Sequence, residues 1–188
     1  SRNFGLLLCA AVSAGCIPTV FAQPSTYPDK PIRLVVPYPP GGSTDVLART
    51  LGDRVSRELG QPVIVDNRAG ASGNIGAGYV AKSAADGYTI FLGTSTALAV
   101  NPSLYKQLPY DPLRDFAPII LATKLPSLVV VPANSAVTSM RELTEQLKAT
   151  NGKASYASAG NGTPAHLGGE LYKRMAGVQA EHVPYKGG

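Results

Sequence analysis

Strand-like and helix-like segments alternate in the first half of this chain, and this alternation restricts the fold more than any other feature. Short apolar runs at 31–37, 62–66 and 88–96 have the length and composition of buried strands. Segments of helical composition, 43–60 and 72–87, lie between them. Strands that are joined by helices pair in parallel through right-handed crossovers. The sequence therefore predicts an α/β fold built on a parallel sheet.

The first predicted helix has a clear end and an apolar face. Gly60 is typical of a helix C-cap, and Pro62 follows it. Apolar side chains recur every fourth residue and predict one stripe of an amphipathic helix: Leu47, Leu51, Val55 and Leu59.

The connection to the second half of the chain is long. Residues 101–118 are rich in prolines and short turns and are expected to form a loop. The apolar runs 119–122 and 127–131 are expected to form a path that leaves the first sheet for a second one.

The pattern of strands and helices then resumes. Ser139 and Glu142 have the spacing of a capping box at the start of a helix. After a strand at 154–157, Thr163 is a natural N-cap with Pro164 at the first helical position. The buried stripe of this last helix is predicted to consist of Leu167, Leu171 and Met175, before an extended segment from Glu181 onward.

Residues 1–22 differ in kind from the rest of the chain. A single charged residue, Arg2, precedes an apolar stretch that ends in small residues, which predicts a cleavable secretory leader with cleavage after Ala22. A membrane anchor is the competing interpretation, although small residues and a proline interrupt the run. A lipoprotein, acylated at Cys16, is a further alternative. Residues 23–30 are predicted to be a linker.

Composition narrows the classes of partner. Both cysteines, Cys9 and Cys16, lie in the predicted leader, so we expect no disulfide and no cysteine-based metal site in the mature chain. The chain has 17 Lys and Arg against 12 Asp and Glu, a net charge of +5. This mild excess favours small anions. Because the basic residues are spread along the chain, nucleic-acid binding is not expected.

Two glycine-rich turns, at 39–45 and 158–163, each lead from a predicted strand into a helix. The first amides of a helix have no partner within it, and the peptide dipoles add partial positive charge there. The carboxyl ends of parallel strands are also where α/β sheets bind ligands. The turns therefore predict a phosphate or carboxylate site. The first turn lacks the lysine of a P-loop, and the glycines at 70, 73 and 76 lack the dinucleotide spacing, so a carboxylate is favoured.

Several side chains near these turns have two possible roles. Asp45 could pair with a ligand amine or stabilise the helix dipole, and the second role is the commoner one. His166 could donate to an anion or be a half-exposed helix residue, whereas a structural role is favoured for His182. Tyr38 and Tyr185 could line a cleft or pack in the core. The sequence contains no G-x-S-x-G elbow and no metal-ligand spacing, so neither catalysis nor a metal or other cofactor is predicted.

Four segments in fixed order resemble the Bug family, the periplasmic solute receptors of tripartite tricarboxylate transporters. They are "YPDKPIRLVVPYPPGGSTDVLAR", "GQPVIVDNRAGASGNIGAGYVAKSAADGYT", "ASAGNGTPAHLGGE" and "VPYKGG". The resemblance implies a type II periplasmic-binding (Venus flytrap) fold with two α/β domains, the first at 31–122 and the second at 123–188. Family members continue beyond the last motif, so the second domain is expected to be incomplete in this sequence.

The resemblance also implies where a solute binds. In the family, a carboxylated solute lies between the domains and is held mainly by backbone amides and waters from the two loops. Together with the flanking side chains, the predicted ligand-binding set is Tyr38, Pro40, Gly41, Gly42, Ser43, Thr44, Asp45, Ser95, Thr96, Ser158, Ala159, Gly160, Asn161, Gly162, Thr163, His166 and Tyr185.

The leading functional hypothesis is a monomeric periplasmic receptor. It would capture a small organic anion, either an organic acid or an acidic amino acid, and deliver it to membrane transporter subunits. A ligand sensor that is read by a signalling partner would have the same pocket chemistry and remains an alternative. An α/β hydrolase-type or phosphate-handling enzyme is the third hypothesis.

Overall fold

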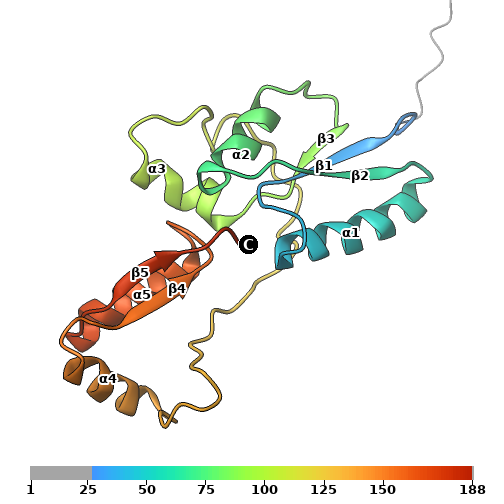
Figure 1. The fold of residues 1–188 in the computed structure, drawn as a ribbon. Helices are drawn as coiled ribbons and strands as arrows, with labels where there is room; N and C mark the ends of the chain where they lie inside the picture. Colours follow the sequence, from blue (N-terminus) through green and yellow to red (C-terminus); the bar gives the residue numbers. More distant parts are fainter. Residues whose placement is uncertain (1–26, 188) are drawn as a thin grey trace, which may run out of the picture.

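Residues 27–187, which the computed structural model describes, form two groups of elements joined by a long connection (Figure 1). The predicted leader, its cleavage site and the alternatives for residues 1–22 lie outside the described residues. The first group contains a three-stranded sheet and the second a two-stranded sheet. All strand pairs in both sheets are parallel, as the alternation of strands and helices predicts. No helix within 27–187 combines the length and the apolar composition that a membrane-spanning helix needs.

The first sheet has the strand order β2-β1-β3. β1 (Ile32–Val36) is central, and it is buried except at Arg33 because helices cover both faces of the sheet. β2 is Val63–Asn67 and β3 is Thr89–Phe91.

The helices α1 (Ser43–Leu59) and α2 (Asn74–Ala81) lie on opposite faces of the first sheet (Figure 1). α1 leads from β1 to β2, and the chain then returns through α2 to β3 on the other side of β1. Two right-handed crossovers in opposite directions place their helices on opposite faces. The carboxyl ends of β1 and β2 therefore open at one edge of the sheet, where their loops can meet a ligand.

α1 packs on the sheet through small residues rather than through the predicted stripe. Ala48 is fully buried, and Gly52 lies so close to β2 that a Cβ there would be 3.3 Å from Val63 Cγ1. The predicted stripe lies beside this line, half-buried or exposed: Leu47, Leu51, Val55 and Leu59. The stripe thus borders the closest contact, because a helix approaches a sheet most closely where its side chains are smallest.

The chain after β3 is more helical than predicted. β3 ends at Phe91, and a π-helical segment, η2 (Thr96–Val100), continues into α3 (Asn101–Leu104). Buried Thr96 and Asn101 lie in these two turns. The prediction of a strand to residue 96 and a loop from 101 is thus wrong there, since such short turns have no apolar period to reveal them.

The long connection forms the predicted path between the two sheets, but its apolar runs enter no strand. Residues 117–133 have no regular secondary structure. Leu128 and Val130 are each 82% exposed.

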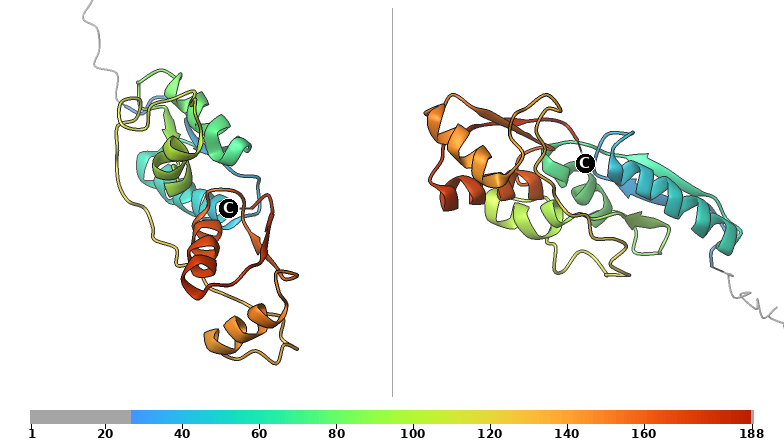
Figure 2. Two further views of the ribbon diagram at one scale, coloured as in Figure 1. Left: turned by 90° about the vertical axis from the view of Figure 1, so that its left-hand side faces the viewer. Right: turned by 90° about the horizontal axis from the view of Figure 1, so that it is seen from below.

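The second group contains α4 (Met140–Ala149), β4 (Ser155–Ser158), α5 (Pro164–Ala176) and β5 (Glu181–Pro184). Its strands pair from the register Ser155 with Glu181 onward. In all the views of Figures 1 and 2, this group lies next to α3.

The helix starts in the second group agree with the sequence. Ser139 Oγ accepts from the Glu142 amide at 3.3 Å, and Thr163 Oγ1 accepts from the His166 amide at 3.4 Å, so both predicted N-caps are confirmed.

The buried face predicted for α5 is wrong. The three residues of the predicted stripe are exposed: Leu167, Leu171 and Met175. α5 instead faces β4 at Gly169, which leaves no room for a Cβ beside the ring of Tyr156. The Tyr156 ring packs against the backbone of α5 at Gly169, where the helix has no side chain. The spacing of apolar residues cannot reveal such a contact.

Candidate ligand-binding cleft

A cleft of about 320 Å3 lies where the two groups of elements meet. Each of its walls follows the carboxyl end of a parallel strand, the edge at which α/β sheets bind ligands. The first group contributes residues 37–39 after β1 and 69–73 after β2. The second contributes residues 159–161 and Thr163 after β4, and 185–187 after β5. A cleft of this volume suits a small molecule.

Part of the predicted ligand-binding set lines this cleft: Tyr38, Ala159, Gly160, Asn161, Thr163 and Tyr185. The other predicted residues lie outside its lining: Pro40, Gly41, Gly42, Ser43, Thr44, Asp45, Ser95, Thr96, Ser158, Gly162 and His166. The two predicted turns thus reach one cleft, the first through the residues that precede its glycines. The ligand-binding role of the whole set stays a prediction.

The predicted ligand-binding set contains no residue of the segment after β2, 69–73, although this segment lines the cleft. In the sequence, the glycines at 70 and 73 are notable only as an imperfect dinucleotide motif. Their position just after β2, which pairs with β1, is the signal that identifies a cleft loop. Ser72 Oγ donates to the Asn161 carbonyl at 3.0 Å across the cleft, and Asn101 Nδ2 donates to the Ser72 carbonyl at 2.9 Å. This loop is therefore held from both sides.

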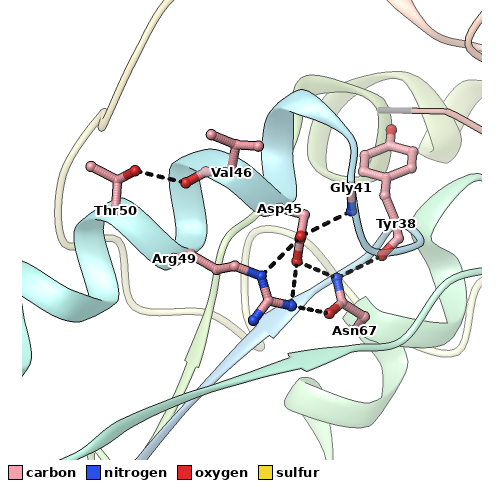
Figure 3. Close-up of polar contacts among 7 residues, drawn as sticks. All are labelled: Tyr38, Gly41, Asp45, Val46, Arg49, Thr50 and Asn67. Atoms are coloured by element: carbon pink, nitrogen blue, oxygen red, sulfur yellow. Dashed lines mark hydrogen bonds and ion pairs between the residues drawn. The ribbon is translucent and has the colours of Figure 1, made fainter.

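Asp45 lies at the centre of the hydrogen bonds that hold the first turn (Figure 3). Its carboxylate, on a residue only 3% exposed, accepts from the Gly41 amide at 2.9 Å, from Arg49 Nε at 3.0 Å and from Asn67 Nδ2 at 2.9 Å. Asn67 Nδ2 also donates to the Tyr38 carbonyl at 3.1 Å. These contacts support the helix-stabilising role of Asp45 and engage the Gly41 amide, which was predicted to bind the ligand.

The same contacts make the stability of the protein depend on pH. Arg49, the Gly41 amide and Asn67 lower the pKa of Asp45 from 3.8 to about 2. Because the folded-state pKa lies below that of the unfolded chain, Asp45 stabilises the fold above about pH 4, and this contribution disappears as the pH falls toward 2. We expect Asp45→Asn to have a lower Tm than wild type near pH 6 and the difference to shrink in this acid range. A thermal scan at each pH measures this, and a constant difference would contradict it.

The second turn is braced by its own side chains. The Gly160 amide donates to Ser158 Oγ at 3.1 Å, and the Gly162 amide donates to His166 Nδ1 at 3.1 Å. Thr163 Oγ1 donates to the Gly160 carbonyl at 2.7 Å. Of the two roles weighed for His166, these contacts support the structural one.

His182 connects β5 to this turn. Its Nε2 lies 2.6 Å from Ser158 Oγ, and its ring stacks on that of His166 with centroids 4.1 Å apart. Burial, and then the charge of His166, lower the pKa of His182. Its contacts agree with the structural role expected for it. Among residues 27–187, no three His, Cys, Asp or Glu side chains gather closely enough to hold a metal ion.

Comparison with known proteins shows which family has similar sequences. The family model described as the tripartite tricarboxylate transporter family receptor matches residues 47–188. A UPF0065 protein of the tcbD-tcbE intergenic region of Pseudomonas sp. is 46% identical over 86% of this chain and 48% of its own length. Protein BugT of Bordetella pertussis is 45% identical over 86% of this chain and 50% of its own. The chain thus spans about half the length of the curated relatives it matches.

Solved structures agree. R. palustris Rpa4515 with adipate has a TM-score of 0.83 and 42% identity, covering 86% of this chain and 54% of its own. MatC (Rpa3494) from Rhodopseudomonas palustris with bound malate has a TM-score of 0.77 and 30% identity, covering 86% and 55%. The periplasmic binding protein BugD has a TM-score of 0.73 and 37% identity, covering 86% and 54%. The chain shares the fold of periplasmic solute-binding proteins.

Proposed function

Because the chain belongs to the receptor family of tripartite tricarboxylate transporters, as its motifs predicted, we propose that it binds a small carboxylate in the periplasm and delivers it to the membrane subunits of such a transporter. Receptors of this family form a solute-binding class and not an enzyme class. We further propose that the protein acts as a monomer and that its two groups of elements correspond to domains at 31–122 and 123–188.

The observation that carries the proposal is the cleft between the two groups. Its lining within the described chain contains no His, Cys, Asp or Glu, so no side chain of these types faces a bound molecule as nucleophile or general base. The lining consists mostly of prolines, alanines, glycines and two tyrosines, which can contact a small bound molecule without reacting with it. Adipate and malate, named with two of the similar structures, are both carboxylates and support this ligand class.

A ligand panel tests the proposal on the full chain. We expect adipate, malate or another small carboxylate to raise the Tm, because only the folded state binds it. At about a hundredfold excess over Kd, the shift should be roughly 5–10 °C. Hexanediol, which has the carbon chain of adipate without its charges, is the matched control and should cause no shift. The proposal fails if no organic acid or acidic amino acid in the panel changes the Tm.

A further inference from the structure

Among residues 27–187, the cleft lining has a single charged residue, Lys186. All other residues that line it within 27–187 are Pro, Tyr, Ala, Gly, Ser, Asn or Thr. Lys186 itself is exposed, and it forms no ion pair with another residue in that range. Any counter-charge that the lining offers to an anion must therefore come from this residue.

The backbone holds Lys186 at the cleft. The Tyr185 amide donates to the Ser158 carbonyl at 2.9 Å, and the Gly187 amide donates to the Ala159 carbonyl at 3.4 Å. These bonds extend the pairing of β4 with β5 past the end of β5 and fix the chain on both sides of Lys186. A lysine stem is flexible, so its ammonium group can follow an anion within the cleft.

Three of the turn amides are already engaged by the side chains of the protein. Those of Gly41, Gly160 and Gly162 donate to Asp45, Ser158 and His166 respectively. Three cations on the neighbouring elements are paired as well: Arg49 with Asp45, Arg68 with Asp66 and Lys173 with Glu170.

From these contacts we infer that Lys186 is a specificity-determining residue, whose ammonium group pairs with a carboxylate of an aliphatic acid while Pro37, Pro39 and Ala71 contact its carbon chain. The inference rests on the proposed function and adds to it the group that recognises the charge. A charge-assisted hydrogen bond of this kind is stronger than a neutral one. Each additional carboxylate on the ligand finds no further cation in the lining formed by residues 27–187, so a tricarboxylate should bind more weakly than the dicarboxylate adipate.

The test is calorimetric titration of the full chain with adipate. Lys186→Met keeps the length of the side chain and removes its charge, and it should raise Kd roughly 10- to 100-fold. Lys186→Arg should restore most of the affinity. Lys148→Met, which removes an exposed lysine on α4 away from the cleft, is the matched control and should bind as wild type does. The salt dependence of adipate binding should also decrease in Lys186→Met alone, an effect that a merely structural residue would not produce.

The outcomes separate this inference from the proposed function. If wild type binds adipate and Lys186→Met binds it equally well, the role of Lys186 is overturned and carboxylate binding stands. If wild type binds citrate more tightly than adipate, the inference that Lys186 is the one cation that recognises the ligand is overturned. If wild type binds no acid in the panel, the proposed function fails and this inference fails with it.

Discussion

Gly160→Ala is expected to weaken carboxylate binding roughly 10- to 100-fold. Gly160 lines the cleft with φ of +129°, a backbone conformation that residues with a Cβ rarely adopt. A Cβ there would also lie 3.3 Å from the Tyr185 carbonyl oxygen, a backbone atom beside Lys186. Relief of this strain must move either the loop or the chain around residues 185–187, and both are cleft walls. Calorimetric titration with adipate measures the loss.

Gly177→Ala provides the control for this prediction. Gly177 also has positive φ, +63°, but no atom lies within 4 Å of its Cβ position, and it follows α5 away from the cleft. We expect it to lower the Tm slightly and to leave adipate affinity unchanged. Equal losses of affinity in the two variants would show that general destabilisation, and not the shape of the cleft, explains the effect at Gly160.

Gly76→Val should be the most destabilising of the substitutions considered, with a loss of about 3 kcal/mol in the free energy of unfolding. Gly76 lies on α2 where the helix crosses the end of β1. A Cβ there would be 3.1 Å from the Arg68 carbonyl oxygen and 3.2 Å from Pro37 Cα. These are backbone atoms, which cannot rotate away as a side chain does. Urea unfolding followed by circular dichroism measures the change.

Gly168→Val is the matched control for Gly76→Val. Gly168 is also a helical glycine, on α5, and its Cβ position has no neighbour within 4 Å. Valine is a better helix former than glycine, so this variant should be as stable as wild type or slightly more stable. If both valines cost the same free energy, close packing of α2 on β1 is not what requires glycine at residue 76.

The sequence was sufficient for the fold class, because alternating apolar strands and capped helices leave few topologies open. The strands of the first sheet are parallel as predicted, and Thr163 and Ser139 cap their helices as predicted. What the sequence did not reveal is which helix face lies closest to a sheet. On α1 and α5 the contact passes through Gly52 and Gly169, whose missing side chains leave no apolar signal.

The candidate site was predictable in its location but not in its hydrogen bonds. Strand ends followed by glycines point to two of the segments that line the cleft. The engagement of Gly41 by Asp45, and of Gly162 by His166, depends on side-chain rotamers that no local pattern records. The same limit concealed Lys186, since a lone lysine after a strand becomes notable only when the rest of the lining is known to be uncharged.

The connection through residues 117–133 has a consequence for work with this chain in solution. Within it, residues 127–131 are uncharged and include three consecutive valines, and their backbone pairs with no strand among residues 27–187. Such a segment is a template on which identical chains can stack as intermolecular β-structure. Self-association at high protein concentration is therefore expected to start from this stretch and to decrease when a single lysine is placed among its valines.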